Sequence, residues 1–192
     1  YKILRIDAGQ TKVEGEAGIA AYTNSLILND RVFVPLFGID TDQQALETWR
    51  KALPGYEVTG YEYNEQMSDG NPFRSFDALH CRTRAVWDPQ MLYMTHNQLQ
   101  PNVIAQNEYQ IDVTIKDYSK TGLVDSSLKL HWRVVGSASW NDIPLDMSST
   151  PSVYSAQIIG AQTGESIEYY MTAEDHSGRQ ESLPRSAPDA FY

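Results

Sequence analysis

The chain contains a single cysteine, Cys81, and its neighbours could support covalent chemistry. His80 precedes it, and Arg82 and Arg84 follow closely. Nearby cationic side chains favour the thiolate, which is the form of cysteine that attacks an electrophile. A free cysteine is also among the residue types most often buried and inert, so Cys81 could equally be a small apolar side chain that fills a gap in a core. Both interpretations stay open at this point.

The general base for such a thiol is not evident from the local sequence. If His80 and Cys81 lie on a strand, their side chains point to opposite faces of the sheet. A partner from another part of the fold is therefore needed. A thiol-dependent peptidase would pair Cys81 with a distant histidine, but no local signature of those enzymes surrounds this cysteine.

The elements that must position Cys81 have an α/β pattern. A helix is predicted over residues 41–53, with polar capping residues at its start and Pro54 at its end. Its apolar residues recur at helical spacing. They are Ala45, Leu46, Trp49 and Leu53.

Strands are predicted on both sides of this helix, because apolar and β-branched residues alternate there. Asn29 and Asp30 predict a hairpin turn between two buried strands. A polar loop over residues 8–18 is expected between the strand of residues 1–7 and the hairpin. A second polar loop, over residues 64–75, is expected to lead to Cys81. The predicted strands are residues 1–7, 22–29, 31–37, 56–63 and 82–87.

From about Pro101 the helical period disappears. Short alternating runs follow one another, separated by turn-forming residues, which is typical of an antiparallel sandwich. We therefore predict two domains: an α/β domain over residues 1–96 and a seven-stranded immunoglobulin-like β-sandwich over residues 101–192. The large aromatic residues of the second domain are expected to pack in its core and edges rather than to form a sugar platform. They include Trp132, Trp140, Tyr169 and Tyr170.

The composition excludes several classes of protein. The net charge is -10, from 25 acidic and 15 basic residues, and no basic stripe is present, so neither nucleic acid nor an anionic membrane surface is an expected partner. No apolar run has the roughly 18 residues that span a bilayer, and we expect no membrane insertion and no attached signal peptide. Because the sequence starts at Tyr1 rather than Met, we expect a processed or truncated chain. One cysteine excludes an internal disulfide.

No metal site is expected. Asp69 and Asn71 could bind a structural cation, but no cluster of acidic residues has the spacing of a calcium loop. We interpret both residues as turn formers.

Three segments resemble one known family. They read "YTNSLILNDRVFVPLFG", "DQQALETWRKALPGYEVTGYE" and "DALHCRTRAVWD", and they are similar to the closing part of the catalytic domain of Porphyromonas-type peptidylarginine deiminases, a family related to agmatine deiminases. The tail "IEYYMTAEDHSGRQESLP" is similar to the immunoglobulin-like domain that follows catalysis in those secreted enzymes. The resemblance implies a secreted or cell-surface bacterial protein.

The resemblance implies roles for two residues. Cys81 matches the nucleophile, which attacks the guanidinium carbon and forms a covalent amidino intermediate that water hydrolyses. Asn24 matches an asparagine of the substrate pocket; from the residues alone it could also be a turn residue at the start of a strand. No cofactor is implied. The stretch "FRSF" at residues 73–76 departs from the family pattern and puts the preference for terminal arginines in doubt.

The resemblance also implies partners that the sequence does not supply. In the family, a histidine and acidic residues from earlier modules of a five-bladed α/β propeller complete the site, including a His-x-Asp pair. None of the four histidines of this chain stands in a His-x-Asp or His-x-Glu pair. Residues 1–96 are therefore expected to form about the last module, which would bind the missing part of the domain or self-associate.

Two classes of function follow. The first is the nucleophile-bearing part of a protein-arginine deiminase, inactive alone, with arginine-containing peptides as substrates and agmatine as the alternative. The second is a non-catalytic β-sandwich interaction module in which Cys81 is buried filler.

Overall fold

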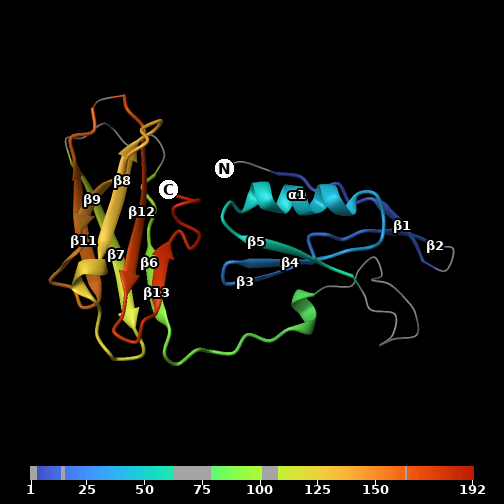
Figure 1. Ribbon diagram of the computed structural model, residues 1–192, viewed down its shortest axis with the longest axis horizontal. Coiled ribbons are helices and arrows are strands. Elements are labelled where there is room, and N and C mark those ends of the chain that lie inside the picture. The colour runs from blue at the N-terminus through green and yellow to red at the C-terminus, as the bar shows by residue number, and fades with distance from the viewer. Residues whose placement is uncertain (1–3, 14–15, 63–78, 101–107, 163) are drawn as a thin grey trace. The chain divides into compact units, whose positions relative to one another are not determined.

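A computed structural model describes residues 4–13, 16–62, 79–100, 108–162 and 164–192. The chain divides into two compact units, Tyr1–Val86 and Trp87–Tyr192, which are described separately (Figure 1). The described part of the chain is mostly β-sheet with one α-helix. That helix has 11 residues, and no described helix is long and apolar enough to cross a membrane.

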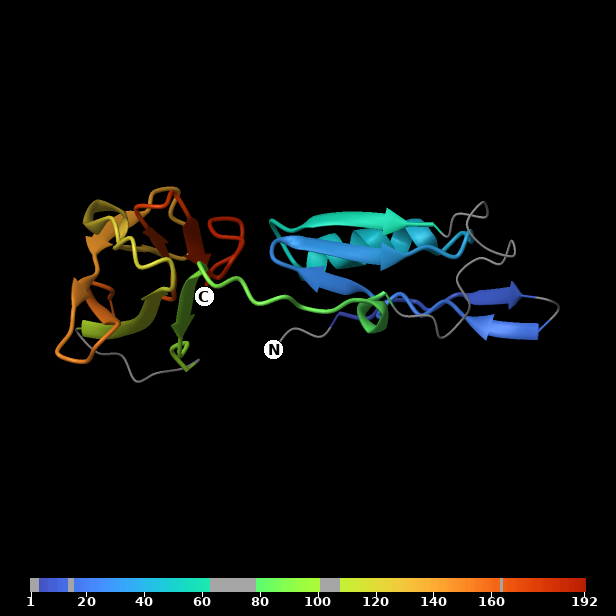
Figure 2. The ribbon, with the colours of Figure 1, turned by 90° about the horizontal axis from the view of Figure 1, so that it is seen from below.

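The first unit is built on a three-stranded sheet with one crossover helix. The strand order is β3-β4-β5, in which β3 is antiparallel and β5 parallel to the central strand β4. The helix α1 connects β4 to β5 and lies along one face of this sheet (Figure 2). A separate two-stranded hairpin, β1-β2, precedes the sheet. The elements are β1 Gln10–Val13, β2 Glu16–Ile19, β3 Leu26–Leu28, β4 Arg31–Pro35, α1 Asp42–Ala52, β5 Glu57–Tyr61 and the 3₁₀ turn η2 His80–Arg82.

The predicted hairpin, helix and following strand are confirmed. Asn29 has φ of 55° in the turn between β3 and β4, a conformation that asparagine tolerates. Val32 and Val34 of β4 are fully buried and share a core with Ala45 and Leu46 of α1. The helix ends before Gly55, whose φ of 80° suits glycine.

Four local predictions for this unit are wrong. Residues 8–18 were expected to be a loop but contain the β1-β2 hairpin, and residues 4–7 form no strand. The strand β3 is not buried, since Ile27 and Leu28 are about half exposed, because it is a three-residue strand at the edge of the sheet. Residues 82–87 are not a strand: η2 ends at Arg82, and the residues after it pair with no strand among those described.

The second unit consists of two four-stranded antiparallel sheets. Their orders are β10-β11-β7-β6 and β13-β12-β8-β9. Buried residues of both sheets form one shared core, which includes Ile111, Ile158, Leu130 and Met171. The strands are β6 Leu92–His96, β7 Glu108–Asp117, β8 Lys129–Val134, β9 Asn141–Pro144, β10 Asp146–Met147, β11 Val153–Ile159, β12 Ile167–Glu174 and β13 Gln180–Leu183.

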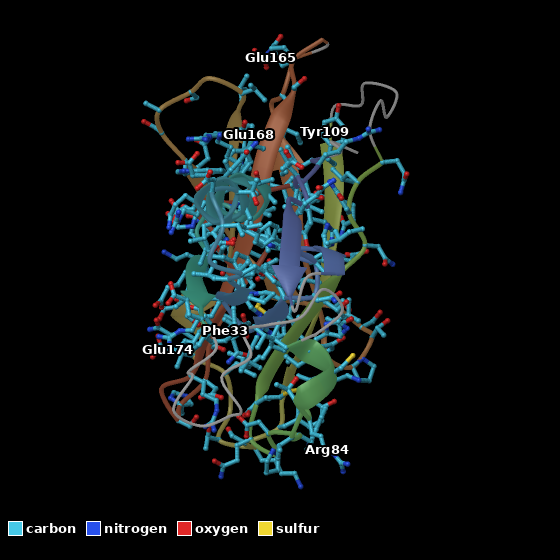
Figure 3. The ribbon with its side chains drawn as sticks, turned by 90° about the vertical axis from the view of Figure 1, so that its right-hand side faces the viewer. Phe33, Arg84, Tyr109, Glu165, Glu168 and Glu174 are labelled. Atoms are coloured by element: carbon cyan, nitrogen blue, oxygen red, sulfur yellow. The ribbon has the colours of Figure 1, made fainter. Side chains whose placement is uncertain are left out.

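The strand β12 shows the alternation that builds this core. Tyr169 and Met171 point inward and are buried, whereas Glu168 and Glu174, labelled near the two ends of β12 in Figure 3, are only partly buried. Tyr169 was correctly expected to pack in the core. The assignment of this unit to the immunoglobulin-like topology stays a prediction.

The predicted domain boundary needs correction. Residues 92–96 were assigned to the first domain, but they form β6, which pairs with β7 over its whole length. Leu92 and Met94 point from β6 into the core of the second unit. The units separate after Val86, because β6 and β7 are neighbouring strands of one sheet.

Candidate active site

Cys81 lies in the 3₁₀ turn η2 and its side chain is exposed. The turn is closed by Thr83, whose backbone N–H and hydroxyl both donate to the His80 carbonyl, at 3.4 and 3.0 Å. Leu79, just before the turn, is half-buried and packs against the core of the first unit. The interpretation of Cys81 as buried filler is therefore wrong: Leu79 is the core residue of this segment, and Cys81 faces solvent.

The Cys81 turn is attached to the segment that carries Asn24. The Leu79 N–H donates a hydrogen bond of 3.0 Å to the Asn24 carbonyl. Asn24 is half-buried, and one residue, Ser25, separates it from the start of the strand β3. The two residues that the sequence predicts for the site thus lie on adjacent segments, although they are 57 positions apart. Their roles stay predictions.

The Asn24 segment is a tight turn over residues 21–25. The Asn24 N–H donates to the Ala21 carbonyl at 2.9 Å, and the Ser25 hydroxyl donates to the Tyr22 carbonyl at 2.6 Å. The Trp49 indole of α1 donates to the same Tyr22 carbonyl at 3.2 Å. Three donors from different directions therefore fix the backbone that leads to Asn24.

The Tyr22 side chain anchors this turn in the core. Its ring is 1% exposed and packs edge-on against Phe37, with centroids 5.3 Å apart. Its hydroxyl donates to the Asp42 carboxylate at 2.6 Å and lies 2.8 Å from the Thr41 hydroxyl. Burial, followed by the hydrogen bond to Asp42, raises the pKa of Tyr22, so the hydroxyl stays a donor.

Asp42 is buried, and its carboxylate accepts hydrogen bonds from backbone N–H groups. Its two oxygens accept the N–H groups of Phe37, Gly38 and Ile39 at 2.8 to 3.2 Å, in addition to the Tyr22 hydroxyl. Sequence reasoning took the residues at the start of α1 as helix caps and missed this connection. The available signal was an acidic residue at the start of the helix, shortly after the apolar run "VFVPLFGI".

The cationic residues around Cys81 are mostly solvated. His80 and Arg84 are exposed, and Figure 3 labels Arg84 just past the η2 turn with its side chain directed away from the ribbon. Water and salt screen charges in such positions. His80 is the only histidine in residues 1–86 of the sequence.

Two of the other histidines are committed to contacts within the second unit. His96 Nδ1 lies 2.7 Å from the Asp112 carbonyl, and its Nε2 lies 2.9 Å from the Tyr169 hydroxyl. His131 Nδ1 lies 2.7 Å from an Asp142 carboxylate oxygen, and its Nε2 lies 3.1 Å from the Thr172 hydroxyl. Both ring nitrogens of each histidine are therefore used in holding strands together.

Some predicted features fall outside the described residues. These are Asp69, Asn71 and the stretch at residues 73–76. Within the described ranges, no group of three or more His, Cys, Asp or Glu side chains could hold a metal ion.

Comparison with known proteins identifies relatives of the first unit. Residues 1–86 match the family model of the Porphyromonas-type peptidyl-arginine deiminase. The chain is 38% identical over 85 residues to a protein of Marinomonas sp. (strain MWYL1) named as an agmatine deiminase, an alignment that covers 44% of this chain and 21% of that protein. It is 32% identical over 83 residues to a protein of the same name from Vibrio parahaemolyticus, covering 42% and 21%. The chain thus spans about a fifth of the length of these curated relatives.

Proposed function

Because residues 1–86 match the family model of the Porphyromonas-type peptidyl-arginine deiminase, we propose that this unit supplies the nucleophile of a guanidino-group deiminase. The observation that carries the proposal is that the matched segment contains, near its end, an exposed cysteine on a turn hydrogen-bonded to the Asn24 turn. An exposed thiol on a fixed turn can approach a planar substrate. The reaction class is hydrolysis of a C–N bond.

The proposed reaction has two covalent steps. The Cys81 thiolate attacks the guanidinium carbon, a C–S bond forms, and one terminal C–N bond breaks with release of ammonia after its nitrogen is protonated. Water then attacks the same carbon, the C–S bond breaks, and the oxygen of water remains as the carbonyl of the ureido product. Cys81 returns to its thiolate, so the net reaction is guanidinium plus water to urea group plus ammonium.

Asn24 has a positioning or binding role in this proposal. Its backbone carbonyl is used by Leu79, which keeps the side chain on a fixed turn near the cysteine segment. A side-chain amide can donate to and accept from the guanidinium or the tetrahedral intermediate.

The acid, the base and the carboxylates are proposed to come from other modules of a propeller domain. The chemistry requires a proton donor for the leaving nitrogen and carboxylates that hold the cation. His80 is the only histidine of residues 1–86, and both ring nitrogens of His96 and His131 are engaged. We therefore propose that these 192 residues alone are inactive and that the first unit binds the remaining modules or a second copy.

Two substrate classes are supported by different observations. The matched family model is described by its activity on peptidyl-arginine, whereas the curated relatives are named as agmatine deiminases. We propose arginine in peptides as the principal substrate and agmatine as the alternative. The second unit is proposed to be an immunoglobulin-like accessory domain of a secreted or cell-surface bacterial enzyme.

Product release tests this proposal. The purified chain, alone and together with the preceding modules of its catalytic domain, is incubated with an arginine peptide or with agmatine, and ammonia and ureido product are quantified. We expect turnover only in the reconstituted sample and none with Cys81→Ser. Turnover by the chain alone would show that the acid and base lie within it, and no turnover after reconstitution would favour the non-catalytic module.

A further inference from the structure

Tyr22 and Asp42 form a connection between the helix α1 and the proposed site. The Asp42 carboxylate is fixed by three backbone N–H groups of residues 37–39, and it accepts the Tyr22 hydroxyl at 2.6 Å. This carboxylate is 7% exposed, and the Tyr22 side chain is 1% exposed. Hydrogen bonds to a buried ionised group are among the stronger ones in proteins, so this contact fixes Tyr22.

The backbone of Tyr22 is fixed at the same time from a second direction. Its carbonyl accepts the Trp49 indole at 3.2 Å and the Ser25 hydroxyl at 2.6 Å. The Tyr22 side chain is thus hydrogen-bonded to Asp42, which begins α1. The Tyr22 carbonyl is hydrogen-bonded to Trp49, which lies in the last turn of the helix. The turn over residues 21–25 has little freedom to shift relative to the helix.

A backbone hydrogen bond connects this turn to the segment that carries the cysteine. The Asn24 carbonyl accepts the Leu79 N–H at 3.0 Å, two residues before Cys81. Among the described contacts of residues 79–83, this is the hydrogen bond that ties the cysteine segment to the rest of the unit, and Leu79 adds an apolar contact with the core. A shift at Tyr22 would therefore move both Asn24 and the start of η2.

We propose that Tyr22 is a positioning residue of the site, which, through its hydrogen bond to Asp42, holds the Asn24 turn in the place where it receives the Cys81 segment. Tyr22 touches neither substrate nor thiol in this scheme. The inference rests on the proposed function of Cys81. It adds that contacts of α1 with the Asn24 turn determine where the Cys81 segment lies. Loss of the Tyr22 hydroxyl should loosen the Leu79 contact without removing any group of the site itself.

Amide hydrogen exchange measured by NMR on the whole chain tests the coupling. In Tyr22→Phe, we expect the exchange rate of the Leu79 amide to rise about tenfold relative to the amides of the central strand β4, and the Cys81 amide resonance to shift. Dividing the exchange rate of the Leu79 amide by the rates of the β4 amides corrects for a uniform loss of stability. Asp42→Asn should act in the same direction, because an amide offers one acceptor oxygen to four donors. The matched control is Tyr61→Phe, an exposed tyrosine at the end of β5 whose ring contacts Phe33.

A second readout separates this inference from the proposed function. With the preceding modules present, labelling of Cys81 by a haloacetamidine, which an ordered guanidinium site accelerates, should fall about tenfold in Tyr22→Phe, whereas iodoacetamide labelling should not change. If the Leu79 ratio is unchanged, the positioning role is refuted even if wild-type Cys81 is labelled. If wild-type Cys81 is not labelled, the proposed function fails and the positioning role fails with it.

Discussion

At the scale of single residues, the account depends on two side chains with different kinds of support. Cys81 is exposed on a turn within the segment that matches a deiminase family, and Asn24 lies on the turn that holds this segment. The Asn24 backbone has a structural contact that does not need its side chain.

Asn24→Ala should impair catalysis. The Leu79 hydrogen bond uses the Asn24 carbonyl and survives the substitution. We expect kcat/KM of the reconstituted enzyme to fall about ten- to hundredfold, as for loss of a hydrogen bond to a charged group. Thr23→Ala, at an exposed neighbouring position, is the control. Equal kcat/KM values for both variants would remove Asn24 from the site.

The sequence allowed Cys81 and Asn24 to be predicted, but not the residues that hold them. Cysteine is recognisable from its chemistry and its setting, and the Asn24 prediction came from a family resemblance. Tyr22 and Asp42 are distant in the sequence and act through a buried hydrogen bond. Such pairs leave no periodic pattern, because a tyrosine in a turn and an acidic residue at a helix start are each ordinary.

At the scale of elements, the sequence predicted the strands and the helix that local signals define, and missed strands that depend on a pairing partner. The β3-β4 hairpin, α1 and β5 followed from turn residues and helical spacing. The β1-β2 hairpin and the placement of β6 were missed. In both cases the strand is defined by its partner in the sheet, which single-strand alternation does not reveal.

The revised boundary predicts how fragments behave. Residues 87–192 should fold with a cooperative thermal transition, because the core of the second unit lies within them. Residues 97–192, which lack β6, should lose about 3–6 kcal/mol of unfolding free energy, since Leu92 and Met94 no longer contribute to that core. Denaturation followed by circular dichroism compares the two. Equal stabilities would restore the boundary that the sequence suggested.

The contacts of His96 predict a pH dependence for the second unit. Burial lowers the pKa of His96, opposed by the hydrogen bond to the Asp112 carbonyl and by the charge of Asp112. Because Nδ1 faces a carbonyl oxygen, it donates, and Nε2 accepts from the Tyr169 hydroxyl, whose pKa burial raises to about 12. A proton on Nε2 would disrupt this arrangement.

The unfolded chain therefore binds a proton at His96 more readily than the folded unit. The stabilisation is complete above the ordinary histidine pKa of 6.5 and is lost as the pH falls below it. We expect the unfolding free energy of residues 87–192 to decline between about pH 7 and 5, by at most about 1.4 kcal/mol per pH unit for this group. The carboxylates with lowered pKa values, such as Asp112 and Asp142, act at lower pH. An identical decline in His96→Gln would show that another group is responsible.

At the scale of the whole molecule, the chain joins two units with different evidence for their roles. The first matches the family model of the Porphyromonas-type peptidyl-arginine deiminase, whereas the second is a two-sheet β unit with its own core. The first unit covers about a fifth of the length of its curated relatives. We propose that the activity belongs to an assembly in which this chain contributes the thiol.

Mass spectrometry of a covalent adduct tests whether Cys81 is a nucleophile for guanidinium carbon. The chain, together with the preceding modules of the catalytic domain, is treated with a haloacetamidine, and peptides are analysed for the added amidine. We predict a single adduct on Cys81 that forms faster than on a free cysteine peptide, that an arginine peptide suppresses and that Cys81→Ser abolishes. Labelling of Cys81 at the rate of the free peptide, unaffected by the arginine peptide, would contradict the account.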